Sequence, residues 1–272
     1  MNKLISPLSE RGWYPHDTRE LHEQIDNSIK KSEPQHVSAL IAPHAGYRWC
    51  SEAIGHAMRH VSDRYTNIIL LGPSHKKRFR DFVVTCDYDC ISTPLGDCRL
   101  SEPPQGRIFL NSNDLHLAEH SMLQHVPYVQ KCCPSASVLP VMVSEMSDAL
   151  ELQFIDWLLS FFNEETLLVV SSDFTHYGDK FNYTPYDKNI RDNIFKFDHI
   201  VIDYIVNGDY NKYKTFINNN RNTICGRYTI LILMNLLQHI KTKPTSHKYL
   251  MSGDLVDDYS NTVSYAGIDF IS

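Results

Sequence analysis

The sequence of 272 residues contains no long hydrophobic run, and this absence limits the class of protein it can encode. No apolar stretch approaches the roughly 18–20 residues that cross a bilayer, so we expect no membrane span. The first residues, MNKLISPLSERGWY, lack a sustained apolar region, so we expect no secretory signal. Internal repeats, low-complexity tracts and Gly/Ser-rich linkers are also missing, which favours a single domain over residues 1–272.

The cysteines lack the regular pairs of a disulfide or zinc-ribbon protein. There are seven, an odd number, and they favour free thiols in a reducing cytoplasm over a disulfide framework. Cys86, Cys90 and Cys98 lie close together in the sequence, but no fourth ligand follows at zinc-ribbon spacing. We therefore interpret these three as ordinary small residues.

A large excess of charge of either sign is absent as well. The net charge is −6, which provides no basic surface for nucleic acid or for an anionic membrane. Hydrophobic residues make up 42% of the chain and charged residues 21%, and this balance is typical of a folded globular protein.

Short, continuous apolar segments alternate with helical patterns along the chain. Fully apolar strands are typical of parallel sheets that are buried on both faces. The predicted fold class is therefore α/β, with a mostly parallel central sheet flanked by helices. We expect strands at 36–43, 67–72, 81–87, 135–144, 166–172, 247–253 and 263–271, and helices at 51–62, 147–162 (capped by Ser147), 186–207 and 224–241.

Polar side chains follow three of the predicted strands immediately after their carboxyl ends. His44 and His75 each follow one strand, and Asp173 and His176 follow another. An open α/β sheet binds its ligands beyond these ends, so we expect the four side chains to share one edge. Imidazole is a common ligand for iron, copper or zinc, and a carboxylate near a histidine can support it as a general base. The alternative is structural: histidines bonded to the backbone at turns, and Asp173 as a helix cap.

Cys225 directly precedes a strong helical pattern. A helix N-terminus lowers the pKa of a nearby thiol, which favours a thiolate that binds soft metals. Gly226 indicates a close approach of the backbone, and Arg227 adds a cation beside the sulfur. The alternative is a small buried hydrophobic residue.

Other residues are expected to line the cleft. Trp13 and Tyr14 lie on an early loop and could form an aromatic wall, with core packing as the alternative. His120 and His125 are five residues apart, a spacing that does not align two ligands on one helix face. We therefore expect these two histidines to be structural or cleft-lining, and we place Arg227 at the cleft as well.

Eight segments, in this order, resemble the Memo family, which is named for a mediator of cell motility. They are GWYP, IAPHAGY, ILLGPSH, STPLGD, EHS…HVPY, VVSSDFTHYG, NTICGR and SYAG, and the resemblance covers nearly the whole chain, from Gly12 to Ile271. NTICGR is typical of the eukaryotic branch. The resemblance implies a fold similar to that of the class III non-haem iron extradiol dioxygenases. The sequence departs from the family pattern at Leu123, Thr175 and Tyr177.

The resemblance also implies roles for particular residues. His44, His75 and Cys225 would face the metal, and His176, with Asp173 beside it, stands where the dioxygenases have their catalytic base. Those enzymes use a carboxylate as the third iron ligand, so a cysteine shifts the preference toward copper or zinc while still allowing Fe(II).

Three functions remain open at this point. The first is a metal-binding redox protein that holds Fe(II) or copper and is linked to cell motility and cytoskeletal signalling. The second is a non-catalytic adaptor that binds phosphotyrosine peptides of signalling proteins in the same cleft, with Lys76, Lys77, Arg78 and Arg227 attracting the phosphate. The third is a zinc-dependent hydrolase with His176 as the base.

Overall fold

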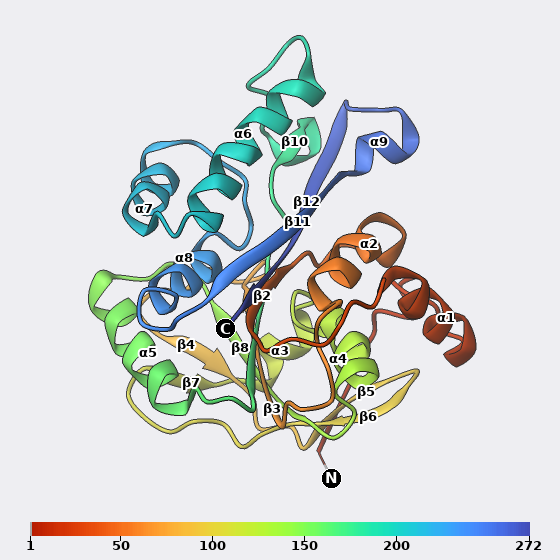
Figure 1. Ribbon diagram of the computed structural model, residues 1–272, viewed down its shortest axis with the longest axis vertical. Coiled ribbons are helices and arrows are strands. Elements are labelled where there is room, and N and C mark those ends of the chain that lie inside the picture. The colour runs from red at the N-terminus through yellow and green to blue at the C-terminus, as the bar shows by residue number, and fades with distance from the viewer. Residues whose placement is uncertain (1) are drawn as a thin grey trace.

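Four parallel strands form the middle of a nine-stranded sheet in the computed structural model, which describes residues 2–272 (Figure 1). Their order across the sheet is β2 (Val37–Ala42), β9 (Thr166–Ser171), β3 (Asn67–Pro73) and β8 (Ser137–Val143). Each pair of neighbours in this group is parallel, so their carboxyl ends meet at one edge. The predicted α/β class is confirmed.

The strands outside this group make the sheet mixed. On one side β12 (Asn261–Ile271) pairs antiparallel with β2 and with both β10 (His176–Gly178) and β11 (Lys243–Met251). On the other side β4 (Val83–Thr85) is antiparallel to β8 and parallel to β7 (Phe109–Asn111). A separate small sheet consists of β1 (Lys3–Ile5), β5 (Cys90–Thr93) and β6 (Gly96–Arg99).

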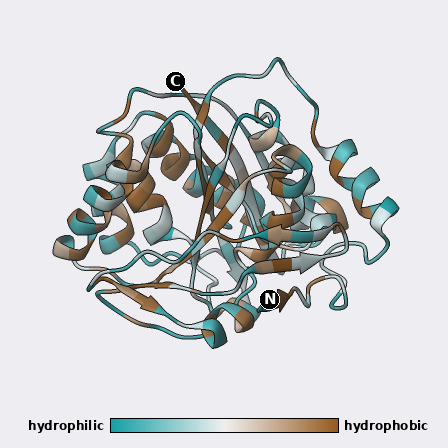
Figure 2. Ribbon diagram, turned by 90° about the horizontal axis from the view of Figure 1, so that it is seen from below, coloured by the Kyte–Doolittle hydropathy of each residue, from teal (hydrophilic) through white to brown (hydrophobic). Residues whose placement is uncertain are grey.

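The continuous apolar runs in the sequence arise because helices cover both faces of the sheet. In β9, Leu167 and Val169 belong to one core cluster, and Leu168 and Val170 belong to the other. Successive side chains of a strand point to opposite faces, so a strand buried on both faces needs an apolar residue at every position. Figure 2 shows the hydrophobic colouring of the central strands and of the inner sides of the helices.

The helices divide between the two core clusters. The first cluster includes residues from three helices, which are α1 (Thr18–Ser28), α2 (Tyr47–Met58) and α4 (Val126–Cys132). The second includes residues from four, which are α5 (Asp148–Phe161), α6 (Ile190–Val206), α7 (Tyr210–Asn219) and α8 (Arg227–Leu236). Four short elements complete the fold: α3 (Asn113–Ala118), η1 (Leu123–His125), η2 (Asp179–Phe181) and α9 (Ser252–Val256).

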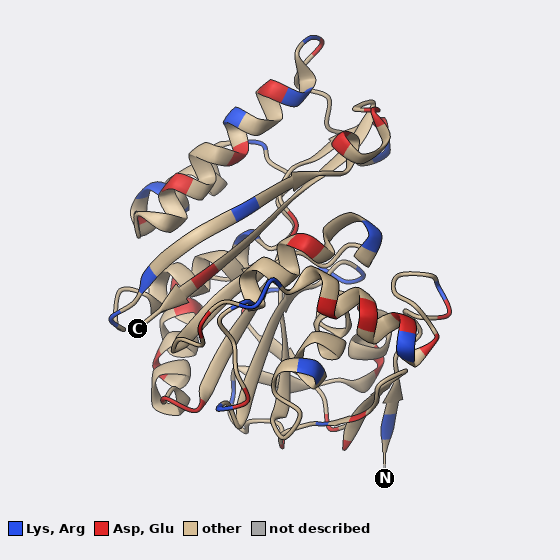
Figure 3. Cartoon of the chain, turned by 45° about the vertical axis from the view of Figure 1, so that its right-hand side comes forward, with Lys and Arg blue, Asp and Glu red and all other residues tan. Residues whose placement is uncertain are grey.

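The outer surface carries charges of both signs. Figure 3 shows basic and acidic positions interspersed along the outer helices and loops. None of the helices within residues 2–272 is both long enough and apolar enough to cross a membrane.

Several predicted elements are shorter in the structure than in the sequence pattern. The pattern at 224–241 narrows to α8, the pattern at 186–207 begins only at Ile190, and the strand at 81–87 retains three residues as β4. Apolar residues continue beyond the hydrogen-bonded turns because loops also pack on the core. Two longer helices, α1 and α7, were not predicted.

Ser147 caps α5 as predicted, accepting a hydrogen bond from the Leu150 N–H at 3.3 Å. We expect Ser147→Ala to lower the free energy of unfolding by about 1 kcal/mol because a helix N–H loses its partner. Urea denaturation measures this change. Ser112→Ala is the matched control, since Ser112 occupies the N-cap of α3 without a side-chain cap bond. An equal loss in both variants would contradict the capping role.

Candidate metal centre

The ends of three parallel strands bring the predicted residues together. His44 follows β2 by two residues, His75 follows β3 by two and Asp173 follows β9 by two. The strand registers align these ends, with Ala42 opposite Ser171 across the β2–β9 pair. The turns after the strands therefore start at nearly the same level of the sheet edge.

Cys225 reaches this edge because Gly226 packs against the end of β9. A Cβ atom at position 226 would lie 2.4 Å from the Ser172 Cβ and 2.6 Å from the Ser171 carbonyl oxygen. The Gly226 N–H also donates a 3.1 Å hydrogen bond to the Ser172 hydroxyl. Only glycine permits this close approach, and the segment before α8 thereby places the sulfur beside His44.

Three potential ligand atoms converge at the edge. One ring nitrogen each of His44 and His75 and the sulfur of Cys225 all lie within 4.8 Å of one another. The closest recorded pair is His44 Nε2 and Cys225 Sγ, at 3.3 Å. Metal bonds of about 2.0–2.3 Å place two ligand atoms roughly 3–4 Å apart, so small side-chain shifts would let one ion contact all three.

The hydrogen bonds of Ser171 fix the tautomer of His44. The Ser171 hydroxyl donates its single proton to the Ser121 carbonyl oxygen at 2.6 Å. His44 Nδ1 lies 2.6 Å from the same hydroxyl oxygen and His125 Nε2 lies 2.9 Å from it, so both ring nitrogens must be donors. Burial, reinforced by the nearby histidines, lowers the pKa of His44 well below its usual value. The neutral ring therefore presents the Nε2 lone pair toward the sulfur, as a metal ligand requires.

Glu119 supports His75 in the same way. Its carboxylate accepts hydrogen bonds from His75 Nδ1 at 2.8 Å and from the His75 backbone N–H at 2.6 Å. It also accepts from the backbone N–H groups of His120 and Ser121. Burial opposes ionisation of Glu119, but its hydrogen bonds with His120 and His75 hold the pKa of the carboxyl well below its usual range. His75 Nε2 is left available for a ligand.

The thiol of Cys225 differs from the sequence expectation. Burial is the largest influence and, together with the Asp173 carboxylate, raises its pKa well above the usual value. Burial therefore outweighs the predicted lowering by the dipole of α8, whose N-cap Gly226 directly follows Cys225. In the metal-free chain the sulfur therefore keeps its proton at neutral pH, and a bound cation would have to displace it.

Asp173 and His176 lie at the site but do not bond to each other as expected. Asp173 Oδ1 accepts the His44 backbone N–H at 2.8 Å, and the Asp173 N–H donates to the Cys225 sulfur at 3.1 Å. His176 Nδ1 instead lies 3.0 Å from the Phe174 carbonyl oxygen and 3.1 Å from that of Thr223. Backbone carbonyls thus fix the ring of His176, with Nδ1 as the donor and Nε2 as the free base. Burial lowers the pKa of His176, while the nearby Asp173 charge opposes this.

A cavity of about 590 Å³ opens on these residues, and we call it the aromatic cavity. Trp13 and His120 are among its walls, together with other aromatic side chains; the residues are Arg11, Gly12, Trp13, His44, Ala45, Gly46, Trp49, His75, His120, Asp173, His176, Phe181, Val263 and Tyr265.

Three predicted cleft residues are not among its walls. Tyr14 is buried in the core, where its hydroxyl bonds to Ser6 and its ring packs on Tyr47. His125 is buried behind His44, and burial lowers its pKa to about 3. Arg227 lines a neighbouring cavity instead.

Sequence reasoning missed the roles of Ser171 and Glu119 as supports of the two histidines. Ser171 is a single hydroxyl at a strand end and has no spacing signature. Glu119 was visible in the EHS segment, where it precedes a histidine. Among the departures from the family pattern, Leu123 is a core residue and Thr175 donates to the buried Asp198 at 2.6 Å.

The chain matches the family model of the Memo-like proteins over residues 11–269. The chain belongs to the Memo family. It is 28% identical to Protein MEMO1 of Homo sapiens over 93% of each chain. It is also 27% identical to Protein memo-1 homolog of Caenorhabditis elegans, over 95% of this chain and 80% of that protein. The resemblance drawn from the eight segments is confirmed, and this Memo-family chain matches these relatives over most of its length.

Glu119→Gln tests the support of His75 in this Memo-family chain. The pKa of the Glu119 carboxyl is lower in the folded chain than in the unfolded chain, so ionised Glu119 stabilises the fold above about pH 5 and loses this effect as pH falls. We expect the variant to lose about 3 kcal/mol of unfolding free energy at pH 7, because hydrogen bonds to a buried charge are removed. Urea titrations from pH 7 to pH 2 measure the difference, which should stay constant down to about pH 5 and shrink below it.

Glu164→Gln is the control for this prediction because Glu164 is exposed to solvent. Its unfolding free energy should follow that of the unmodified chain at every pH. A Glu119→Gln loss that stays constant with pH would contradict the contribution of the ionised carboxylate.

Proposed function

We propose that the chain is a metal-binding redox protein that holds iron or copper through His44, His75 and Cys225. The observation that carries this proposal is the fixed tautomer of His44, whose free Nε2 faces the Cys225 sulfur because Nδ1 must donate to Ser171. A histidine that merely filled space would not need its second nitrogen held in this way. The carboxylate behind His75 supports the same interpretation.

The donor set decides which metals fit. Two imidazoles and one sulfur form a softer site than two imidazoles and a carboxylate, which favours copper or zinc and still accommodates Fe(II). Iron or copper would supply one-electron chemistry and a place for dioxygen to bind. Zinc would support only hydrolysis, which is the alternative reaction for the same residues.

His176 is the group that we assign to proton movement. Its Nδ1 is occupied by two backbone carbonyls, so the free Nε2 is the atom that can accept a proton. The residue lines the aromatic cavity, where a substrate would lie. Asp173 acts on His176 through its charge and fixes the His44 backbone by a hydrogen bond.

The cellular role is proposed from the family. Its name links it to cell motility, and a cytoplasmic protein with seven free cysteines fits a role in cytoskeletal signalling.

Removing the three donors should abolish metal binding. We expect His44→Ala, His75→Ala and Cys225→Ser each to weaken it on the order of 100-fold or more, because supporting contacts alone typically contribute 10–100-fold. Elemental analysis of protein purified without chelator measures metal content, and absorption spectroscopy separates iron or copper from zinc. His239→Ala is the control, since His239 is exposed. Equal metal content in the folded triple variant and the unmodified chain would refute the proposal.

His176→Gln should separate proton movement from metal binding. We expect metal content to stay unchanged, while oxygen consumption by the iron-loaded chain, with ascorbate supplied as the electron donor, falls about 100-fold or more, the usual contribution of a general base. An oxygen electrode measures the rate as a function of pH, and His239→Gln is the control. A variant with an unchanged rate and pH profile would show that His176 is not the base.

A further inference from the structure

A second cavity borders the proposed metal centre from another side. It has a volume of about 250 Å³, and its walls include His75 and Cys225. His75 also lines the aromatic cavity together with His44, whereas Cys225 lines only the smaller cavity, so the three donors as a group lie between the two spaces. Because two arginines, Arg78 and Arg227, line this smaller space, we call it the arginine cavity.

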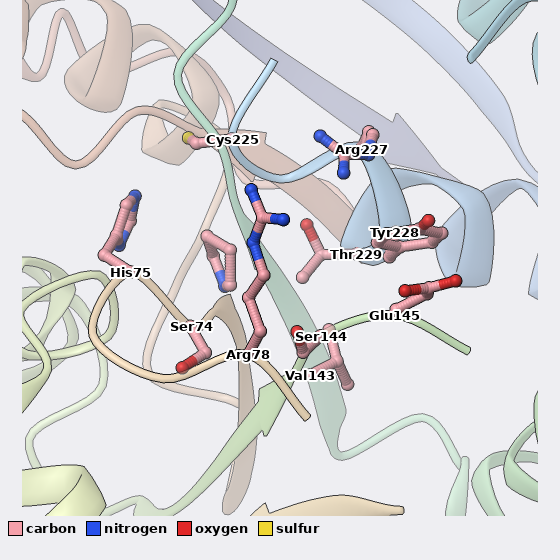
Figure 4. Close-up of a pocket in the computed structure, with 11 residues that line it drawn as sticks. Ser74, His75, Arg78, Val143, Ser144, Glu145, Cys225, Arg227, Tyr228 and Thr229 are labelled. Atoms are coloured by element: carbon pink, nitrogen blue, oxygen red, sulfur yellow. The ribbon is translucent and has the colours of Figure 1, made fainter. Parts of the chain in front are cut away.

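Both guanidinium groups are directed into this space. Figure 4 shows the Arg78 side chain extending from the loop after β3 toward the segment that carries Cys225, with Arg227 pointing into the same region. Within residues 2–272, no carboxylate lies within ion-pair distance of either group, and the Arg227 guanidinium lies over the Tyr228 ring, 5.0 Å from its centroid. The acidic residue of the walls, Glu145, instead pairs with Arg80 at 3.5 Å.

The rest of the wall adds to the positive potential. The first turn of α8, residues 227–229, lines the cavity, and its N-cap Gly226 provides no side-chain acceptor for the helix N–H groups. Two unpaired arginines that face one space repel each other, and an anion between them removes this repulsion while forming charge-assisted hydrogen bonds. Arginine forks match the planar oxygens of a carboxylate or a phosphate.

We propose that the arginine cavity binds the carboxylate or phosphate group of a small organic molecule whose remaining atoms reach the His44, His75 and Cys225 donors. The link to those donors rests on the proposed metal function, whereas anion binding by Arg78 and Arg227 does not. The volume of about 250 Å³ is below the roughly 300–1,000 Å³ of typical ligand pockets, which favours a small molecule over a peptide.

Calorimetric titration of the metal-free chain with malonate and with inorganic phosphate at low ionic strength tests anion binding. We expect Arg78→Gln and Arg227→Gln each to weaken the preferred anion about 10–100-fold, because each removes charge-assisted hydrogen bonds. Arg78→Lys keeps the charge but loses the two-pronged guanidinium, so its anion affinity should lie between that of the unmodified chain and that of Arg78→Gln. Whichever of the two anions binds more tightly identifies the preferred group.

Lys77→Gln is the matched control, since it removes one positive charge from the same loop at an exposed position outside the cavity wall. The affinity of Lys77→Gln for malonate and for phosphate should equal that of the unmodified chain. An equal loss in Lys77→Gln and Arg78→Gln would overturn the proposal, because it would indicate diffuse attraction. Binding of a phosphotyrosine peptide without binding of either small anion would overturn it as well.

Two further measurements keep this proposal distinct from the metal proposal. Cys225→Ser removes the sulfur but leaves both arginines, so anion binding to the metal-free variant should persist even if metal content is lost. Malonate should bind more tightly to the zinc-loaded chain than to the metal-free chain, because its second carboxylate would reach the ion. An unchanged malonate affinity would overturn the link to the donors, and unchanged anion binding in both arginine variants would overturn the cavity assignment alone.

Discussion

The single hydroxyl proton of Ser171 is the constraint on which the site depends. That proton goes to the Ser121 carbonyl oxygen, so His44 and His125 must both donate to the remaining lone pairs. His125 Nδ1 is then an unprotonated acceptor, and it is buried without a partner in the described chain. His125 thus keeps one nitrogen without a hydrogen bond, while His44 keeps its Nδ1 bonded to Ser171 and its free Nε2 facing the sulfur of Cys225. The end of β9 thus sets the state of the ring by geometry.

The two histidines have different supports, and the difference determines the charge of the site. A neutral hydroxyl supports the buried His44, whereas an ionised carboxylate supports His75, whose side chain is 27% exposed. The Cys225 thiolate and Glu119 would together offset the two charges of a divalent cation, and burial raises the pKa of the nearby Asp173 carboxyl, which disfavours a third negative charge. Neutrality matters because an uncompensated charge in a buried site carries a large desolvation cost. Glu119 therefore orients His75 and also balances the charge of the proposed ion.

Strand ends were predictable from the sequence because a buried parallel strand leaves a continuous apolar run that stops at a definite residue. The run before His75 and the one before Asp173 both stop within two residues of the observed strand ends. The residues that support the two histidines were not predictable, because Ser171 acts through one hydroxyl proton that it donates to a carbonyl oxygen far away in the sequence. The predicted direction of the Cys225 pKa shift was wrong, because the local sequence indicates the helix but not the burial of the thiol. For α1 the signals were present, with an Asp17 cap and buried Leu21 and Ile25 four residues apart.

The position of the donors between two cavities restricts which group can be deprotonated. His176 lines the aromatic cavity of about 590 Å³ and is absent from the walls of the arginine cavity. A general base must lie within hydrogen-bond reach of the proton that it removes. An anionic group held by Arg78 and Arg227 is therefore anchored without being deprotonated by His176. In the proposed function, any proton that His176 removes would come from the part of a ligand that extends past the donors into the aromatic cavity, so the two arginines and His176 would act on opposite ends of one molecule.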